Sequence, residues 1–423
     1  MSLKSILKKT IGAERLSNMK GQVFHIACKA KLGNRVMEID NRYLEEKWLI
    51  DFTGYHTFRG YYDLNYLSAD KTKFLVHRLP VNANNNRDIS CEIGYVDMTT
   101  GDFHKVAETH AWCWQQGSRL RWHPVEHNCI IFNDADQDGY CAKILDVDSG
   151  KCVQKIPSPL YDVTPDFSYG LTLNYSRLQR LRPGYGYNFF DDATKNESAP
   201  QNDGIWRVDL NNNSKKMLFS LGELAQKIDS PEKYIHYLNH ISVSPDGKKF
   251  FFFHIYKEKD SKNWKTVLYL SDINGENLKA LEGTDRVSHY CWCNNDEIMV
   301  TCRKENGEEY YCLFNLKSGV KTIIDNQDLS TDGHPNRIGQ TAWYLTDTYP
   351  LKYSCQKIKM FRLGEEHAVT VASFYHDYRL RGEKRCDLHP SITHDGQLVS
   401  VDTTFQNGRR AIMLMSLKGE IIQ

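Results

Sequence analysis

Four histidines recur along the second half of the chain at similar intervals. His240, His289, His334 and His389 are 49, 45 and 55 residues apart. Unrelated structural histidines have no reason to recur in this way, so the spacing predicts one histidine from each of several repeated units. Imidazole binds Zn and Mn alike, and the carboxylate of Asp387 is a further candidate ligand. We therefore expect a divalent metal, Mn or Zn, at His289, His334, Asp387 and His389.

Arginine and tyrosine are the prominent side chains of three segments in the first half, GYHTFRGYYD from Gly54, WQQGSRLRWHP from Trp114 and RPGYGY from Arg182. Arginine binds a carboxylate through paired N–H groups, and tyrosine offers a surface for sugar rings and a proton donor. The pattern predicts an anionic carbohydrate as ligand. The alternative is that each arginine pairs with a local Asp and that the tyrosines only pack. The candidate substrate-binding residues are Arg59, Tyr62, Arg119, Arg182, Tyr185, Tyr187 and His254.

Residues so far apart can meet only if repeated elements place them together, and the sequence contains such repeats. One pattern is an apolar strand, a turn with Gly or Asn, and a second strand, which is typical of a β-hairpin. Its copies are VDMTTGDFHKV from Val96, LDVDSGKCVQK from Leu145, VDLNNNSKKML from Val208, LSDINGENLKAL from Leu270, FNLKSGVKTII from Phe314, KMFRLGEEHAV from Lys359 and MSLKGEIIQ from Met415.

A second pattern precedes most of these hairpins, for example SPDGKKFFFFH from Ser244 and THDGQLVSVD from Thr393. An Asp-containing turn leads into an apolar strand, so each unit contains four strands and about 50 to 55 residues. This predicts an all-β, seven-bladed β-propeller with four-stranded antiparallel blades. An all-β sandwich is the alternative. We assign residues 1–45 to an N-terminal extension, with a short basic helix over 3–18, and 46–423 to the propeller, with an insertion over 192–204.

Composition and charge exclude several classes of protein. The chain has 423 residues with 54 Lys plus Arg against 53 Asp plus Glu, which gives no net field for nucleic acid or an anionic membrane. The longest apolar stretch is far shorter than the roughly 20 residues of a membrane-spanning helix. Twelve scattered cysteines without a CxxC pair, and no signal-peptide pattern, favour a cytoplasmic location. The oligomeric state is left open.

Taken together and in order, the motifs GYHTFRGYYD, WQQGSRLRWHP, LNYSRL with RPGYGY, NHISVSPDG and DLHPS resemble those of the seven-bladed β-propeller polysaccharide lyases. This group includes oligogalacturonate lyase and the propeller-type ulvan lyases. The resemblance covers most of residues 50–420. It implies cleavage of uronate-containing oligosaccharides by β-elimination. The carboxylate is neutralised, a base removes the proton on carbon 5, and an acid protonates the departing oxygen.

The resemblance also implies roles for particular residues. By similarity to oligogalacturonate lyases, His240 is the base, and His289 and His389 belong to the metal site, where Asp387 replaces a histidine. By similarity to ulvan lyases, the early blades supply the catalytic residues. These are His56, His77, Tyr161 and Arg177. The choice within each pair stays open. Arg177 or a metal neutralises the carboxylate, His240 or His56 removes the proton on carbon 5, and Tyr161 or His77 protonates the departing oxygen.

Two other functions are compatible with the same fold. A propeller can be a non-catalytic module that binds a glycan or a protein, because fold alone does not give function. A glycoside hydrolase is a third possibility, and it requires two opposed carboxylates, for which Asp63 and Asp387 are the candidates. Converging His, Arg and Tyr side chains favour the lyase over both.

Overall fold

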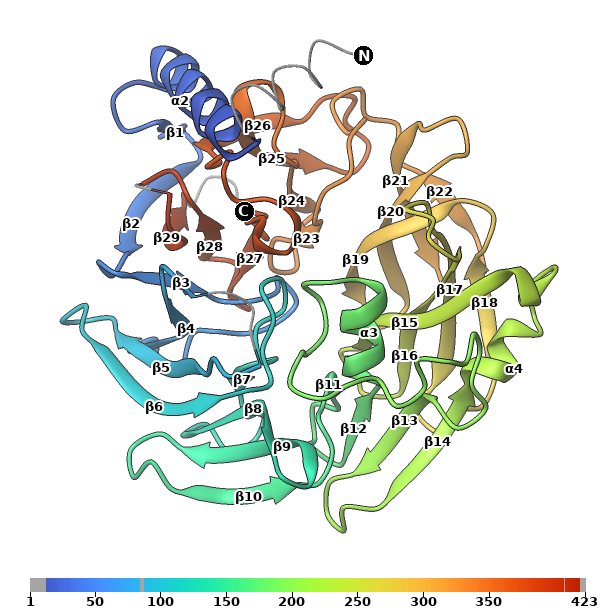
Figure 1. Cartoon of the computed structure of the whole chain (residues 1–423). Helices are drawn as coiled ribbons and strands as arrows, with labels where there is room; N and C mark the ends of the chain where they lie inside the picture. The colour runs from blue at the N-terminus through green and yellow to red at the C-terminus, as the bar shows by residue number, and fades with distance from the viewer. Residues whose placement is uncertain (1–12, 84–86, 407, 419–423) are drawn as a thin grey trace.

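The computed structural model describes residues 13–83, 87–406 and 408–418. Its strands form seven antiparallel sheets arranged around a common centre, like the blades of a propeller (Figure 1). The prediction of an all-β, seven-bladed β-propeller is confirmed. Every blade has four strands, and blade 6 carries a fifth at its outer edge.

The strands of the first four blades follow one another along the chain. Blade 1 comprises β3 (Tyr55–Phe58), β4 (Lys73–Pro80), β5 (Cys91–Asp97) and β6 (Phe103–Thr109). Blade 2 comprises β7 (Arg121–Trp122), β8 (Cys129–Asp136), β9 (Gly139–Asp146) and β10 (Cys152–Ile156). Blade 3 comprises β11 (Asp162–Val163), β12 (Tyr169–Thr172), β13 (Gly204–Asp209) and β14 (Lys215–Ser220). Blade 4 comprises β15 (Tyr234–Val243), β16 (Lys249–Glu258), β17 (Lys265–Asp272) and β18 (Lys279–Glu282).

Blade 5 is also continuous along the chain, whereas blades 6 and 7 each include a strand from the N-terminal part. Blade 5 comprises β19 (Arg286–Asn294), β20 (Glu297–Arg303), β21 (Glu309–Asn315) and β22 (Lys321–Ile323). Blade 6 comprises β23 (Asn336–Arg337), β24 (Trp343–Asp347), β25 (Cys355–Arg362), β26 (Val369–Tyr375) and β1 (Met37–Ile39). Blade 7 comprises β27 (Ser391–Ile392), β28 (Leu398–Thr403), β29 (Ala411–Leu417) and β2 (Leu44–Ile50).

The ring is closed by pairing of the two ends of the chain. β2 runs antiparallel to β29, with Leu44 opposite Leu417 and Ile50 opposite Ile412. The MSLKGEIIQ motif predicts a seventh hairpin that continues from Met415 into the last residues. Residues 419–423 lie outside the described residues, and the described outer partner of β29 is β2. Residues 37–39 similarly extend blade 6 through β1.

The Asp-containing turns have a common local cause. In the SPDG turn, the Ser244 hydroxyl donates to the Asp246 carboxylate at 2.7 Å, and the same carboxylate accepts from the Lys248 backbone N–H at 3.1 Å. Gly247 has a φ of 73°, which glycine adopts without strain. Side-chain capping of this kind fixes the turn from the innermost strand to the second strand. Each blade then buries apolar strands, such as Phe250–Phe253 of β16, against its neighbours.

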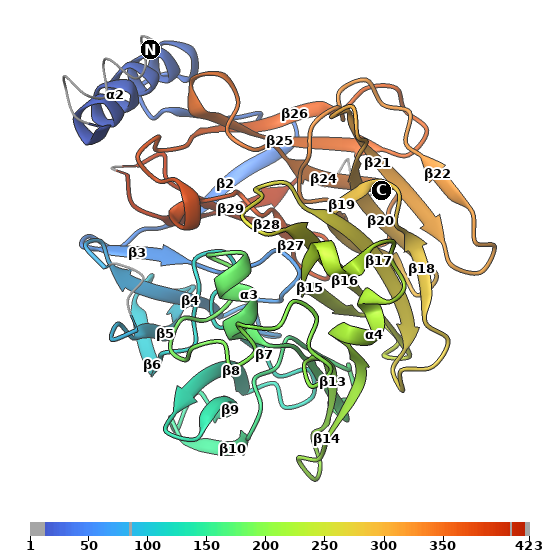
Figure 2. The same cartoon turned by 45° about the vertical axis from the view of Figure 1, so that its right-hand side comes forward.

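The helices lie outside the blades. α2 (Ala13–Leu32) packs Cys28 and Leu32 into the core of blades 6 and 7. Most of the expected helix over 3–18 lies outside the described residues. Between β12 and β13 lies an excursion that contains α3 (Tyr175–Leu181), which sits in front of the ring near its centre (Figures 1 and 2). The other helices are α4 (Leu221–Ala225) and the 3-10 turns η1 (Pro231–Lys233), η2 (Lys352–Ser354) and η3 (Gly382–Lys384). No helix in the described part of the chain is both long and apolar enough to span a membrane.

Candidate metal and carbohydrate site

The four recurring histidines lie together at the centre of the ring, and we call them the histidine cluster. His240 is on β15 and His289 on β19, while His334 and His389 directly precede β23 and β27. The ring centroids of His289 and His334 are 3.9 Å apart, those of His334 and His389 4.4 Å, and those of His240 and His289 6.3 Å. Innermost strands of four blades therefore bring these side chains into one place.

Three histidines of the cluster are held through Nδ1. That atom contacts the Asp332 carboxylate in His289 (2.9 Å) and the Asp347 carboxylate in His334 (2.8 Å). In His389 it lies 3.1 Å from the carbonyl oxygen of Gly60. Because all three partners are acceptors, each Nδ1 carries a proton, and in the neutral imidazole the Nε2 atom keeps its lone pair. Partners of this kind orient the histidine ligands of metal ions.

Two of these Nε2 atoms are buried without any hydrogen-bond partner. They belong to His334 and His389. The nearby Asp387 completes a set of three ligand atoms that lie within 4.8 Å of one another. That spacing is close to what a single ion with bonds of about 2.0–2.2 Å requires. An orphaned buried lone pair is costly unless something fills it. The residues present therefore fit a divalent ion, which two imidazoles and one carboxylate would hold.

His289 stands beside this set without being part of it. Its Nε2 lies 3.4 Å from the Tyr349 hydroxyl. Burial and then the neighbouring His334 lower the pKa of His289, so its imidazole is neutral near pH 7. Burial also lowers the pKa of His389, which keeps its imidazole neutral. In His334 burial acts to lower the pKa, but Asp347 outweighs it and raises the pKa, so a metal ion would have to displace a proton from that imidazole.

Asp387 is fixed by Arg385 through two hydrogen bonds of 2.7 Å each. The guanidinium lies over the Tyr349 ring at 4.8 Å from its centroid. Burial acts to raise the pKa of Asp387, but Arg385 outweighs it and holds the carboxyl ionised. As an ionised and oriented carboxylate, Asp387 is suited to ligate a cation.

His240 occupies a strained position next to the three ligands. Its φ of 52° is unusual for a residue other than glycine, and β15 bulges between Asn239 and Ser242. A bulge redirects a side chain, and strain of this kind gathers at functional sites. The Tyr161 hydroxyl accepts from the His240 backbone N–H at 3.1 Å and so supports the bulge. Burial and then His289 lower the pKa of His240, which makes it a neutral base candidate.

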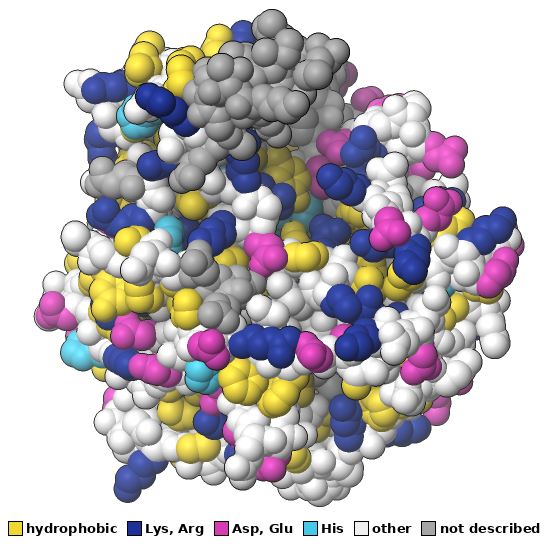
Figure 3. Space-filling view, in the orientation of Figure 1, with side chains coloured by type: hydrophobic (Ala, Val, Ile, Leu, Met, Phe, Trp, Pro, Cys, Tyr) yellow, Lys and Arg dark blue, Asp and Glu magenta, His cyan; other side chains and the backbone are white. Residues whose placement is uncertain are grey.

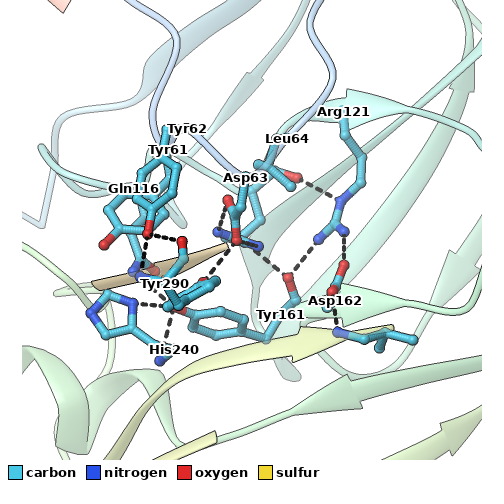
Figure 4. A network of polar contacts seen from close by, with 12 residues as sticks. Tyr61, Tyr62, Asp63, Leu64, Gln116, Arg121, Tyr161, Asp162, His240 and Tyr290 are labelled. Carbon is cyan, nitrogen blue, oxygen red and sulfur yellow. Dashed lines mark hydrogen bonds and ion pairs between the residues drawn. The ribbon is translucent and has the colours of Figure 1, made fainter. Parts of the chain in front are cut away.

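A dense polar network lies beside His240 (Figure 4). Asp63 accepts two bonds of 3.1 Å from the Arg119 guanidinium and one of 3.0 Å from the Tyr290 hydroxyl. Tyr161 accepts from the Gln116 side chain at 2.8 Å. These groups satisfy one another, so Asp63, Arg119 and Tyr161 form a scaffold for the cluster and are not free to bind or protonate a ligand. Asp63 is already paired with Arg119, so it is not the free second carboxylate that a hydrolase requires.

Arg59, predicted to bind substrate, and Arg177, predicted to be catalytic, are also occupied by hydrogen bonds. Arg59 donates to Asp402, Ser400 and the carbonyl oxygens of Leu388 and His389. It therefore positions the backbone of His389, a candidate metal ligand. Arg177, predicted to neutralise a carboxylate, makes five hydrogen bonds to His236, Thr194, Glu197 and Ser198. The structure therefore assigns Arg177 to holding the excursion between β12 and β13.

Three predicted histidines are packed away from the cluster. His56 accepts from the Arg410 backbone N–H at 3.0 Å, and burial lowers its pKa to about 4. His77 stacks on Phe58, and its Nε2 accepts from the Ser118 N–H at 3.0 Å. His254 pairs with His236 at 3.0 Å. These contacts are those of packed side chains, and the roles of the three histidines in catalysis or substrate binding stay predictions.

The remaining predicted residues divide between packing and the cluster. The Tyr62 hydroxyl donates to the Tyr290 carbonyl at 2.6 Å, while its ring lies 5.2 Å from that of His334. Tyr187 stacks on Tyr175 with centroids 4.1 Å apart. Tyr185 is different because its hydroxyl is buried without a partner, and its ring lies 5.9 Å from that of His240. Arg182 lies over the Tyr185 ring at 4.6 Å.

The predicted residue set did not include Asp332, Asp347, Tyr349 and Arg385. Asp332 and Arg385 stand two residues before His334 and Asp387, in the segments DGHPNRIG and RCDLHPSI. Their proximity in the sequence could therefore have identified them as part of the site. Asp347 lies at the end of β24, and only the pairing of β23 with β24 brings it next to His334.

Neither a protein-family profile nor a curated protein sequence matches the chain. Solved structures do resemble it. An oligogalacturonate lyase in complex with manganese has a TM-score of 0.64 at 12% identity, over 92% of this chain and 98% of that one. An oligogalacturonate lyase from Vibrio parahaemolyticus has a TM-score of 0.61 at 10% identity, over 91% and 99%. Tricorn protease has a TM-score of 0.52 at 10% identity, over 85% of this chain but 34% of that one. In its fold, the chain is similar to the propeller polysaccharide lyases.

Proposed function

We propose that this protein binds a divalent cation at the centre of the ring and cleaves uronate-containing oligosaccharides by β-elimination. The observation that carries the proposal is the pair of buried, unpartnered Nε2 atoms of His334 and His389 beside the ionised Asp387. Other buried histidine nitrogens also lack partners, such as Nδ1 of His77 and of His254, but among the described residues only His334 and His389 bring theirs together with a carboxylate within 4.8 Å.

The metal would supply positive charge that neutralises the uronate carboxylate and makes the proton on carbon 5 more acidic. His334, His389 and Asp387 would hold it. Asp347 fixes the imidazole of His334 and the backbone N–H of His389, and Arg385 fixes Asp387. The protein thus prepares the ligand set before any ion arrives, which reduces the cost of binding it.

His240 is proposed as the base that removes the proton on carbon 5. Its pKa lies below the ordinary value because of burial, so the imidazole is neutral and able to accept a proton near pH 7. Tyr185 is proposed as the group that protonates the departing oxygen, since its hydroxyl has no partner and its ring lies 5.9 Å from that of His240. Tyr161 and His77, the acids expected from the sequence, are occupied by other bonds.

The cluster is nearly closed to solvent, since His334 and His389 are only 1% and 2% exposed. Figure 3 shows a hollow near the centre of the front face with a histidine side chain inside it. A carboxylate can enter such a space more easily than a whole sugar ring. We therefore propose that Tyr185 and Tyr349 move outward when the sugar binds.

The fold comparison supports the proposal, because two oligogalacturonate lyases share the architecture and one is a complex with manganese. Their identity to this chain is 12% and 10%, so the substrate and the choice between Mn and Zn belong to the proposal.

The test is an ultraviolet assay for the unsaturated product. Purified protein is incubated with oligomers of galacturonate, glucuronate and iduronate, with Mn, Zn or a chelator, and its metal content is measured in parallel. We expect product with at least one substrate, and loss of both metal and product in His389→Ala. His394→Ala, which removes an exposed histidine from the adjacent turn, should behave like the wild type. Metal-free wild-type protein without product on any substrate would favour a non-catalytic, glycan- or protein-binding propeller.

A further inference from the structure

Two arginines at the edge of the histidine cluster share one aromatic side chain. The guanidinium carbons of Arg182 and Arg286 each lie 4.6 Å from the centroid of the Trp264 indole. Arg182 follows α3, Trp264 precedes β17, and Arg286 begins β19. We call these three residues the Arg–Trp–Arg stack. Segments from blades 3, 4 and 5 thus meet at this point.

These two arginines differ from the others around the ring centre. Arg59, Arg119, Arg121 and Arg385 each pair with an Asp within 3.2 Å. Arg182 and Arg286 have no carboxylate oxygen within the 4.0 Å ion-pair distance among the described residues, and the Nε of each is buried without a partner. A half-buried guanidinium without an anion forgoes its strongest interaction.

The groove beside Arg286 holds more basic than acidic side chains. It has a volume of about 430 Å³ and is lined by Lys265, Arg303 and Lys304 as well as by Asp285 and Glu305. Lys304 pairs with Glu308 at 2.9 Å, and the Asp285 carboxylate is engaged by the Tyr310 hydroxyl. Burial and then Arg303 lower the pKa of Arg286 against the attraction of Asp332 and Glu309. Lys and Arg side chains also gather beside the central hollow on the side of blades 4 and 5 (Figures 1 and 3).

The groove adjoins the histidine cluster through β19. Arg286 stands three residues before His289, which corresponds to about 10 Å along a strand. β19 has a bulge between Val287 and Tyr290, and the extra residue allows Arg286 and His289 to face the same side. On the other side, Arg182 contacts Tyr185, which lies beside His240. One extended ligand could therefore reach both the cluster and the stack.

We propose that the Arg–Trp–Arg stack and the adjoining groove form a second anion-binding subsite, which takes the carboxylate of another uronate unit in an acidic oligosaccharide. This inference rests on the proposed function and extends it. The guanidiniums of Arg182 and Arg286 receive the carboxylate, and Trp264 keeps both in place and offers an apolar surface to a sugar ring. The protein then prefers acidic oligosaccharides that carry charge on successive units over a single uronate.

The test measures binding, apart from catalysis. Dissociation constants for galacturonate, digalacturonate and trigalacturonate are measured by titration calorimetry with Mn present, in a His240→Asn background that prevents turnover. Arg286→Gln and Arg182→Gln should weaken trigalacturonate binding by about tenfold or more and leave galacturonate binding within twofold. The difference in trigalacturonate affinity between the parent and these variants should become smaller at high salt, because salt screens the charges. Arg286→Lys should recover part of the affinity.

Arg362→Gln is the matched control, because Arg362 also lies over an indole, that of Trp343, but on the outer part of blade 6. It should bind every oligomer as the parent does. Equal trigalacturonate affinity in the parent, Arg286→Gln and Arg182→Gln would overturn the subsite and leave the proposed function standing. A parent that binds none of the three galacturonates would overturn the subsite together with a galacturonate substrate, whereas activity on another uronate in the product assay would preserve the proposed function.

Discussion

The two halves of the ring use similar polar side chains in opposite ways. In blades 1 to 3, buried Arg and Asp side chains pair with one another, as Arg119 does with Asp63 at 3.1 Å. In blades 5 to 7, the histidines are anchored through one nitrogen, and in His334 and His389 the other nitrogen has no partner. Residue type alone does not mark a site, and neither does a single unpartnered atom, because Nδ1 of the packed His77 is also unpartnered. What distinguishes the late half is that ligand atoms of His334, Asp387 and His389 lie within 4.8 Å of one another.

The largest expected effect separates His240 from a histidine of the same blade that only packs. His240→Asn removes the proposed base while keeping a residue that tolerates a positive φ. Product formation should fall by about 100- to 10,000-fold with the metal content unchanged. His254→Asn should lower stability and leave the rate per folded molecule close to wild type. Equal rates for wild type and His240→Asn would contradict the role of His240.

The next effect concerns the stability of the early blades. Asp63→Ala leaves the Arg119 guanidinium, which is 1% exposed, without its anion. The free energy of unfolding should fall by about 3–5 kcal/mol, as measured by denaturant titration. Glu46→Ala removes the partner of the exposed Arg35 and should cost less than about 1 kcal/mol. Similar losses for the two variants would show that the early network is not the scaffold described above.

The early half should also respond to pH through its packed histidines. Burial lowers the pKa of His77 to about 4, against about 6.5 in an unfolded chain. Below pH 6.5 the unfolded chain takes up a proton at this histidine that the folded chain does not. The free energy of unfolding therefore falls as the pH falls, and the contribution of His77 is fully present only above pH 6.5. Between pH 7 and pH 5, His77 should account for a loss of about 2 kcal/mol.

Urea unfolding at the two pH values measures this loss. His77→Gln should show a smaller drop in the free energy of unfolding than wild type, whereas the exposed His394→Gln should show the full drop. The same drop in His77→Gln and wild type would mean that His77 is not held neutral by its surroundings.

The smallest expected effect concerns the residue that anchors the candidate metal ligands in blades 6 and 7. Asp347 binds the Nδ1 atom of His334 and the backbone N–H of His389 without being a proposed ligand. Asp347→Asn should weaken Mn affinity by about 10- to 100-fold while one ion per chain still binds at saturation. Asp162→Asn alters a carboxylate that pairs with Arg121 and should leave Mn affinity unchanged. Unchanged affinity in Asp347→Asn would show that the ligand histidines need no such anchor.

The sequence was sufficient to predict the seven blades because each blade repeats its own local signals, the Asp-capped turn and the Gly or Asn hairpin. It also pointed to histidines on successive innermost strands, which the structure brings together. It was not sufficient to separate free arginines from occupied ones. The Asp402 that binds Arg59 is 343 residues away, and three of the carbonyl groups that bind Arg177, those of Thr194, Glu197 and Ser198, belong to an irregular loop. Ring closure by β2 is likewise a pairing between distant segments without a local signal.

Manganese binding tests the central claim most directly. Calorimetric titration of metal-free protein, with anomalous scattering from crystals grown with Mn, gives both the stoichiometry and the position of the ion. The account predicts one Mn per chain between His334, Asp387 and His389, and none in His334→Ala/His389→Ala that is folded by circular dichroism. Absence of binding in the wild type, or equal binding in the double variant, would contradict it.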